Sequence, residues 1–161
     1  MPSKENKNEF LENYLNKVEN VCTKKTLWGY PTNFYEYDEI THGLHNSELT
    51  VVAARHSMGK TSFVLNLAIN IAEQSIPTLL ISYDLSEEAL TGRLISSIAE
   101  VNSNVIKEGN LREKDWEKIS AAYEKLSNLT ENNFLNLVPG CCLNYKDLFE
   151  TIKTFKRTPS S

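Results

Sequence analysis

The sequence predicts an α/β fold, with a parallel sheet flanked by helices. Residues 49–54 and 78–83 are short, continuous apolar runs, as expected of parallel strands that are buried on both faces. Each run is followed by apolar residues at helical spacing, and a third strand and helix repeat the alternation. With 161 residues, 40% hydrophobic and 24% charged, the chain is long enough for one globular core.

The first predicted element is an amphipathic helix over residues 5–24, because apolar residues recur there every three or four positions. They are Phe10, Leu11, Tyr14, Leu15, Val18, Val21 and Cys22. No apolar partner for this face stands nearby in the sequence. An aromatic-rich connector then leads to the first strand, Leu49 to Ala54.

The middle of the chain predicts a helix, a strand and a second helix. Residues 61–74 are apolar on most sides, which is typical of a helix packed on a sheet. Pro77 precedes the strand 78–83, which ends at Asp84. Ser86 is the expected N-cap of a helix over 87–100, and the two acidic residues that follow it suit the positive end of that helix.

The last third of the chain continues the alternation. A short helix over 102–108 is expected to end at Gly109, and a longer one to span 113–128. The apolar face of the longer helix is predicted to be Trp116, Ile119, Tyr123 and Leu126. The third strand is predicted over residues 134–138. Asn144 is expected to cap a final helix with the apolar face Tyr145, Leu148, Phe149, Ile152 and Phe155.

Composition excludes several classes of function. The formal net charge of -4 excludes a basic nucleic-acid-binding module, so any DNA contact must come from local patches or from assembly. No window is long and apolar enough for a membrane span, and the N-terminus MPSKENKNEF lacks an apolar signal region, so we expect a cytoplasmic protein with no membrane contact. The three cysteines show no metal-ligand spacing and are expected to be small buried hydrophobes.

The segment AARHSMGKTS, residues 53–62, is typical of a phosphate-binding loop. Gly59, Lys60 and Thr61 lie between an apolar strand and an apolar helix, where backbone amides, a lysine and a hydroxyl can surround a phosphate chain. The usual pattern has a glycine where this chain has Ala54, which alanine can replace if φ stays negative. The alternative is an ordinary helix start with a chance lysine.

Asp84 is the candidate for orienting an attacking water molecule. It follows the second strand, and ligands of open α/β sheets lie beyond the carboxyl ends of strands. The alternative is a turn or capping aspartate ahead of Ser86. A second carboxylate, at the end of an apolar strand and able to support magnesium, does not occur after the third strand and before Ser161.

An ordered series of short segments resembles the RecA-like motor domain of replicative hexameric DNA helicases of the DnaB type. The resemblance covers residues 28–157, and that family also carries alanine at the position of Ala54. It usually has proline in place of His56 and glutamate in place of Asp84. The matching segments include Gly29-Tyr30-Pro31-Thr32, Asp38, Thr41-His42-Gly43-Leu44, Ala53 to Thr61, Ser82 to Ser86, Arg93-Leu94, Gly109-Asn110-Leu111, Asp115-Trp116 and Pro139-Gly140.

This resemblance implies a RecA-like P-loop NTPase sheet, incomplete, preceded by a linker-type helix. The implied division is 1–27 for that helix, 28–157 for a partial motor domain and 158–161 for a polar tail. Implied cofactors are ATP and Mg²⁺, with Lys60 and Asp84 catalytic and Thr61 holding the metal. The implied nucleotide-binding residues are Arg55, His56, Ser57, Met58, Gly59, Lys60, Thr61 and Ser62.

The resemblance also implies partners and leaves alternatives open. The assembled ring would bind single-stranded DNA, and the helix 5–24 would dock on a helicase subunit or a second copy. The family's Walker B strand and arginine finger would follow residue 161, so ATP turnover by residues 1–161 alone is not expected. The chain is then a helicase portion, or a non-catalytic module that docks on an intact helicase. A recombination- or clock-type RecA-like ATPase is a third hypothesis, less consistent with the matches at Gly29 to Asp38.

Overall fold

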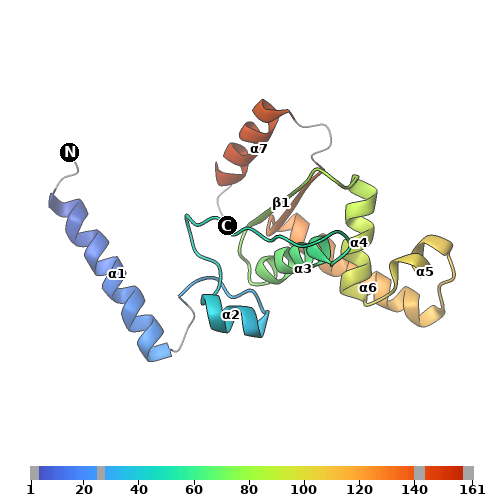
Figure 1. The fold of residues 1–161 in the computed structure, drawn as a ribbon, viewed down its shortest axis with the longest axis horizontal. Helices are drawn as coiled ribbons and strands as arrows, with labels where there is room; N and C mark the ends of the chain where they lie inside the picture. Colours follow the sequence, from blue (N-terminus) through green and yellow to red (C-terminus); the bar gives the residue numbers. More distant parts are fainter. Residues whose placement is uncertain (1–3, 25–27, 140–143, 158–161) are drawn as a thin grey trace. The chain divides into compact units, whose positions relative to one another are not determined.

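The computed structural model describes residues 4–24, 28–139 and 144–157. The chain forms two compact units, residues 1–51 and residues 52–161. The first unit contains the helices α1 (Lys4–Lys24) and α2 (Tyr35–Thr41). The second contains α3 (Lys60–Ala72), β1 (Thr78–Ser82), α4 (Glu87–Ala99), α5 (Ser103–Glu108), α6 (Glu113–Glu131), β2 (Leu135–Pro139) and α7 (Tyr145–Arg157) (Figure 1). Within the described residues, no helix is long and apolar enough to cross a membrane.

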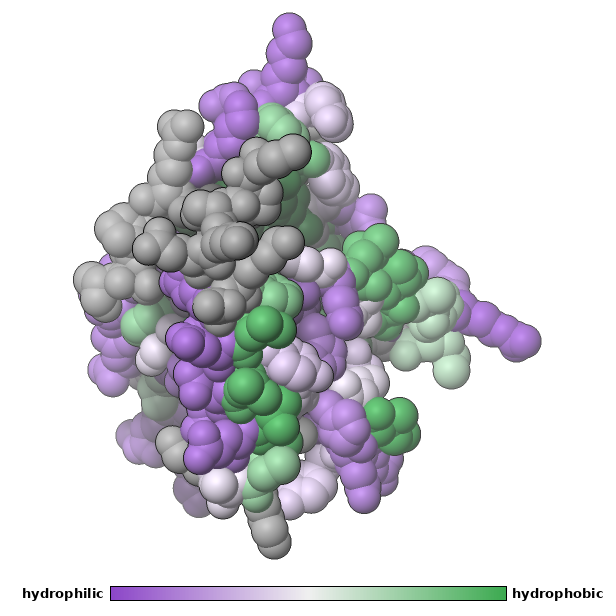
Figure 2. Space-filling view, turned by 90° about the vertical axis from the view of Figure 1, so that its left-hand side faces the viewer, coloured by the Kyte–Doolittle hydropathy of each residue, from purple (hydrophilic) through white to green (hydrophobic). Residues whose placement is uncertain are grey.

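Helix α1 confirms the prediction for residues 5–24. Its Tyr14 ring meets the Trp28 ring edge-on, with 5.7 Å between centroids, and the Lys17 Nζ lies 4.8 Å from the centre of the same indole. Most of the apolar face nevertheless stays exposed, including Phe10, Leu11 and Leu15. Figure 2 views the side on which Figure 1 draws α1, and it shows apolar surface lying between hydrophilic side chains. Within the described residues, α1 therefore presents an apolar stripe that is largely exposed and that meets Trp28 through Tyr14.

A hydrogen-bonded turn centred on Asp38 organises the rest of the first unit. The Asp38 carboxylate accepts hydrogen bonds from the Thr32 backbone N–H at 3.0 and 2.8 Å, the Thr32 hydroxyl at 2.6 Å and the Asn33 backbone N–H at 3.0 Å. Both Thr32 and Asp38 are buried. A buried carboxylate requires such donors, because without them its desolvation would cost several kcal/mol, roughly.

The two chain segments on either side of this turn are joined by backbone hydrogen bonds, and two glycines allow them to approach closely enough. Tyr30 and Leu44 form an isolated antiparallel bridge, with hydrogen bonds of 2.8 Å in both directions. A Cβ atom on Gly29 would lie 2.5 Å from the Leu44 carbonyl oxygen, and one on Gly43 would lie 2.4 Å from the Tyr30 carbonyl oxygen. Only glycine allows this close approach, and Gly43 also has a φ of +89°.

The sheet of the second unit is parallel, as predicted. β1 and β2 pair in parallel along their full lengths, with Leu80 opposite Leu137. The strands predicted at 78–83 and 134–138 agree with β1 and β2 to within about one residue at each end, inside the usual uncertainty of such boundaries. Helices α3, α4 and α6 all contact the strands, and α4 also packs on α3 and α6.

The larger hydrophobic core joins these helices to the sheet. Helix α3 buries Leu65, Ala68, Ile69, Ile71 and Ala72, which agrees with the prediction that residues 61–74 are apolar on most sides. The core comprises Leu65, Ala68, Ile69, Ala72, Leu80, Leu90, Leu94, Leu126, Leu129 and Leu135. The predicted caps also occur: Ser86 Oγ accepts from the Ala89 N–H at 3.3 Å, and Asn144 Oδ1 accepts from the N–H groups of Lys146 and Asp147 at 2.9 and 3.0 Å.

The strand predicted at residues 49–54 is not a strand. These residues form no strand pairing, and the side chains of Leu49 and Val51 are 89% and 77% exposed. A strand needs a neighbour to accept and donate its backbone hydrogen bonds, and none of the described segments provides one. The apolar run therefore marks a segment suited to a sheet but unpaired in this structure.

The apolar face predicted for α6 is partly wrong. Leu126 is buried, but Trp116 and Tyr123 are 57% and 62% exposed. The face that packs inward contains Asp115, Ala122, Leu126 and Leu129. The two helices α4 and α6 pack against each other, and Ala122 at 2% exposure provides the small side chain that a close helix contact requires.

The cysteines also differ from expectation. Cys22 is an exposed free thiol on α1, whereas the sequence analysis expected a small buried hydrophobe. Its helical spacing places it on the apolar stripe of α1, but that stripe is itself uncovered. Cys141 and Cys142 lie outside the described residues.

The N-terminus of α6 gives a testable electrostatic prediction. Asp115 Oδ2 accepts from the Arg112 backbone N–H at 3.0 Å and from its Nε at 3.1 Å, and the side-chain bond is the main reason why the pKa of Asp115 lies below its ordinary value. A lowered folded-state pKa stabilises the fold above the unfolded pKa, and this contribution is lost as the pH falls through the folded pKa. We expect Asp115→Asn to lower the melting temperature at pH 7, with a difference from the parent that shrinks as the solution is acidified. A difference independent of pH would contradict this origin.

Candidate functional site

The segment before α3 forms an open loop with left-handed backbone at two positions. Ser57 has a φ of +62° and Gly59 a φ of +82°, while the Met58 N–H donates to the Arg55 carbonyl at 3.3 Å. A Cβ atom built on Gly59 would contact nothing within 4 Å. Left-handed residues in such a turn direct backbone N–H groups to one side and create concavities that bind anions.

The first turn of α3 is unlike the first turns of the neighbouring helices. Gly59 makes no side-chain cap, and the turn contains no acidic residue. Helix α4, by contrast, has the Ser86 cap and two glutamates in its first turn. The free N–H groups and the positive end of the α3 dipole are therefore not compensated by a side chain that the structure describes.

Lys60 adds a positive charge to this uncompensated end. It is the first residue of α3, it is exposed, and it makes no ion pair or hydrogen bond with the described residues. A cation at a helix N-terminus is electrostatically unfavourable, since the helix dipole is already positive there. Arg55 and His56 are also exposed in the loop before it. The arrangement concentrates positive potential where an anion would be stabilised.

Asp84 lies at the same edge of the sheet as the loop. Helix α3 and strand β1 are in contact and are joined by only five residues, 73–77, so they run in opposite directions. Their lengths, roughly 20 Å for the helix and 17 Å for the strand, are similar. The end of β1 at Ser82 is therefore near the start of α3 at Lys60, and Asp84 follows two residues later.

The local hydrogen bonds around the start of α4 do not involve the Asp84 side chain. Ser86 caps α4, and the Leu85 N–H donates to the Ser82 hydroxyl at 3.2 Å. Asp84 is exposed and forms no hydrogen bond or ion pair within the described part of the chain. Of the two alternative roles, the cap of α4 is provided by Ser86, and a turn-forming role for Asp84 stays a prediction.

In the described part of the chain, side chains alone do not build a metal centre at this site. Among the described residues, no group of three or more His, Cys, Asp or Glu side chains could hold a metal ion. The half-buried Thr61 hydroxyl stands next to Lys60 in the first turn of α3, where it fits a role as one ligand among phosphate oxygens and waters.

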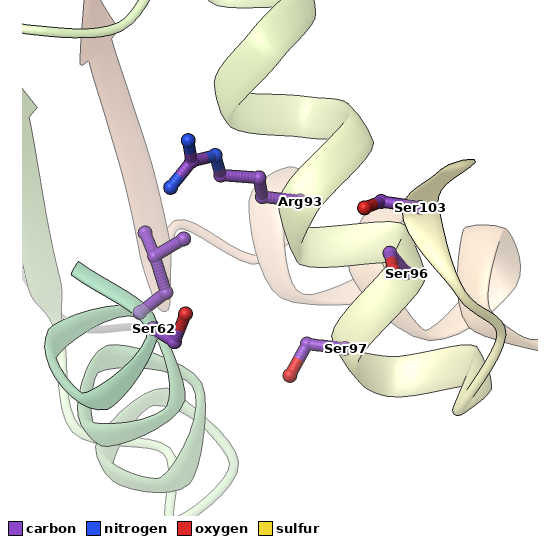
Figure 3. Close-up of a pocket in the computed structure, with 6 residues that line it drawn as sticks. Ser62, Arg93, Ser96, Ser97 and Ser103 are labelled. Carbon is purple, nitrogen blue, oxygen red and sulfur yellow. The ribbon is translucent and has the colours of Figure 1, made fainter. Parts of the chain in front are cut away.

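A cleft beside α3 contains residues that the sequence analysis did not assign to a site. It begins at Ser62 and Leu65 on α3 and is closed on the other side by Arg93, Ser96, Ser97 and Ser103 (Figure 3). Its volume is about 270 Å³. The available sequence signal was the spacing of Arg93, Ser96 and Ser97, which places three polar side chains on one face of α4.

The chain is similar to known protein families over most of its length. The family model described as DnaB-like helicase C terminal domain matches residues 29–157. The replicative DNA helicase DnaB of Nostoc sp. is 39% identical over 120 residues, which are 74% of this chain and 14% of that protein. The replicative DNA helicase DnaC of Bacillus subtilis is 36% identical over 123 residues, 76% of this chain and 27% of that protein.

Solved structures give the same relationship. A structure described as an ATPase domain matches with a TM-score of 0.81 and 26% identity, over 94% of this chain and 52% of that one. A DnaB-like replicative helicase, described together with its interactions with primase, matches with a TM-score of 0.76 and 26% identity, over 92% of this chain and 35% of that one. The chain thus has part of a RecA-like ATPase fold, and it spans about a quarter or less of the length of the curated relatives.

Proposed function

The chain belongs to the family of DnaB-like helicase C-terminal domains, and from this premise we propose that it is the ATP-binding portion of a replicative DNA helicase. One observation carries the proposal. The left-handed loop at Ser57 and Gly59 leads into a helix whose first turn has no side-chain cap and no acidic residue, and whose Lys60 has no partner among the described residues. Such an N-terminus is suited to a polyphosphate, which would compensate both the helix dipole and the lysine.

Each loop residue has a proposed part in binding. Backbone N–H groups of residues 55–61, which include Arg55, His56 and Met58, surround the phosphates, and Lys60 donates to the β- and γ-phosphate oxygens. The Thr61 hydroxyl holds Mg²⁺, which neutralises phosphate charge when it is bound with the nucleotide. Asp84 accepts a hydrogen bond from water at the outer phosphate and orients it. Because its side chain is one methylene shorter than that of the family's usual glutamate, Asp84 reaches less far.

Assembly is the second part of the proposal. The apolar stripe of α1, with Phe10, Leu11 and Leu15 exposed, is a docking face for a helicase subunit or a second copy of the chain. In an assembled ring, the chain would act on single-stranded DNA. The same stripe supports the second candidate function, a non-catalytic module that docks on an intact helicase. Association of the chain with a helicase subunit in the absence of nucleotide binding would favour this second candidate function.

Calorimetric titration of the chain with ATP tests the proposal. We expect one ATP to bind per chain in the presence of Mg²⁺, and weaker binding when Mg²⁺ is chelated, because the phosphate charge is then less neutralised. Thr61→Val should remove most of this Mg²⁺ dependence while leaving Mg²⁺-free binding in place. Thr130→Val, at a similarly half-buried threonine on α6, is the matched control and should behave as the parent. Absence of ATP binding by the parent chain would refute the nucleotide site.

A further inference from the structure

We infer that the exposed side of α6 binds α7 of a second copy of the chain, through aromatic side chains and two matched rows of opposite charge. The inference does not depend on nucleotide binding, and it concerns a surface other than the apolar stripe of α1. Its starting point is the pair Trp116 and Tyr123, which are 57% and 62% exposed and lie seven positions apart on α6. Seven residues are close to two helical turns, so both rings emerge on one side of the helix. Exposed aromatic residues of this kind are enriched at the centres of protein interfaces.

A row of carboxylates runs beside this aromatic pair. Glu117 directly follows Trp116 and Glu124 directly follows Tyr123, so the two glutamates are also seven positions apart and line one edge of the aromatic row. Both are exposed, and neither side chain forms a hydrogen bond or ion pair with the described residues. Ser120, a small exposed residue between the two rings, leaves room for a side chain of a partner. The α6 surface therefore suits an apolar helix face with cations along one edge.

Helix α7 carries the complementary pattern. Lys146 directly follows Tyr145, and Lys153 directly follows the half-buried Ile152 seven positions later, so two exposed lysines line one edge of the apolar row. The rings of Tyr145 and Phe149 stack with 6.2 Å between their centroids and are 79% and 50% exposed. This side of α7 is therefore an open aromatic surface bordered by cations.

The spacing of the charges fixes how the two helices would meet. In each helix the charged row lies about 100° from the apolar row, in the same rotational sense, because each charged residue comes one position after an apolar one. When two such helices face each other, these edges meet only in the antiparallel orientation. Both rows span about 10.5 Å, so Lys146 opposes Glu124 while Lys153 opposes Glu117. Lys153 Nζ also bonds Glu150 at 3.0 Å, which uses one of its three donors.

The contact joins different chains. Figure 1 draws α7 above the strands and the first half of α6 below them, so the two surfaces are separated within one chain. A contact between two unlike surfaces is head-to-tail: each copy offers its α6 to one neighbour and its α7 to another, which builds a ring or an open chain of copies.

Sedimentation equilibrium of the full chain tests the inference by charge reversal. We expect the parent chain to self-associate, and Glu124→Lys or Lys146→Glu alone to weaken the association about fivefold, because an attraction becomes a repulsion. The two substitutions together should restore the affinity, because the pair re-forms with its charges exchanged. Glu117→Lys combined with Lys146→Glu is the matched control. It has the same net charge, but it leaves like charges opposed at both contacts and should not restore the affinity.

The aromatic part of the contact has its own variant, Trp116→Ala, which should weaken self-association at least about fivefold, as for an interface residue of this kind. All the substituted side chains are exposed, so the fold is expected to persist, and circular dichroism checks it. A parent chain that stays monomeric overturns the inference. So does self-association that none of these variants weakens, or that both double variants restore equally. The nucleotide site is tested separately, by the titration with ATP, and does not fall with these results.

Discussion

Replacement of Lys60 by alanine is expected to weaken ATP binding by about 10- to 150-fold, the equivalent of losing a hydrogen bond to a charged group worth roughly 1.5–3 kcal/mol. The physical reason is that Lys60 is the free cation at the uncapped N-terminus of α3, where the phosphates are proposed to lie. Calorimetric titration of parent and variant with Mg²⁺ and ATP measures the effect. Equal affinities would show that the lysine is an incidental feature of a helix start.

The same variant has an unusual expected effect on stability. Lys60 opposes the dipole of α3 and has no ion-pair partner among the described residues, so its removal should leave the free energy of unfolding unchanged or raise it by about 0.3–1 kcal/mol. Lys107→Ala is the control: this lysine lies in the last turn of α5, where a cation is favourable, so its loss should not stabilise the chain or alter ATP affinity. Destabilisation by Lys60→Ala would indicate an overlooked structural contact.

Replacement of Leu94 by alanine is expected to destabilise the fold by about 2–5 kcal/mol. Leu94 has no exposed surface, and it belongs to the core that joins α3, α4 and α6 to the sheet. Truncation removes the transfer free energy of the side chain and leaves a cavity that the surrounding helices fill only in part. Since domains of this size are stable by only about 5–15 kcal/mol, much of the molecule's stability would be lost. Urea unfolding of parent and variant measures the difference.

Leu49→Ala is the matched control for this prediction. The substitution is chemically identical, but Leu49 is 89% exposed in the unpaired segment 49–54, so we expect a change within about 0.5 kcal/mol. A cost comparable to that of Leu94→Ala would mean that residues 49–54 are buried in solution, for example against a second copy. The pair of variants therefore tests the core and the unpaired segment in one experiment.

Local patterns predicted most of the secondary structure correctly. Caps such as Ser86 and Asn144, and a stop signal such as Gly109, act within one turn of a helix, so the sequence carries their information locally. The strand predictions for β1 and β2 were also correct, because these two strands pair with each other. Residues 49–54 show the same pattern and the prediction failed there, since pairing depends on a neighbour that no local pattern reveals.

The errors on helix faces have a related cause. Trp116 and Tyr123 share helical spacing with Leu126, and large apolar side chains were expected to point inward. The contact with α4 instead selects Ala122, because two helices approach closely only where a small side chain lies between them. The expectation that Cys22 is buried was wrong for a different reason. The sequence pattern identifies the apolar stripe of α1, but no described segment packs over Cys22, so its thiol is exposed.

The candidate site was predicted unevenly. The proposed phosphate loop has a local sequence signal, because glycine, lysine and threonine occur together in consecutive positions before a helix. The cleft has none, because Arg93 and Ser62 lie 31 positions apart and come together only when α4 packs on α3. Hydroxyl groups are also common on helix surfaces, so Ser96 and Ser97 carry no distinctive signal until their hydrogen bonds are known.

The turn around Asp38 has a consequence for how this sequence can drift over evolutionary time. Its carboxylate accepts from three donors at once, so asparagine would replace an acceptor with a donor, and glutamate would be one methylene too long. Gly29 and Gly43 are equally restricted by the carbonyl oxygens beside them. None of these positions lies in the segment 53–62, yet we expect them to tolerate fewer replacements than exposed neighbours such as Tyr35 and Ile40. A relative without any nucleotide site would therefore be expected to keep these residues, so they would mark common ancestry independently of function.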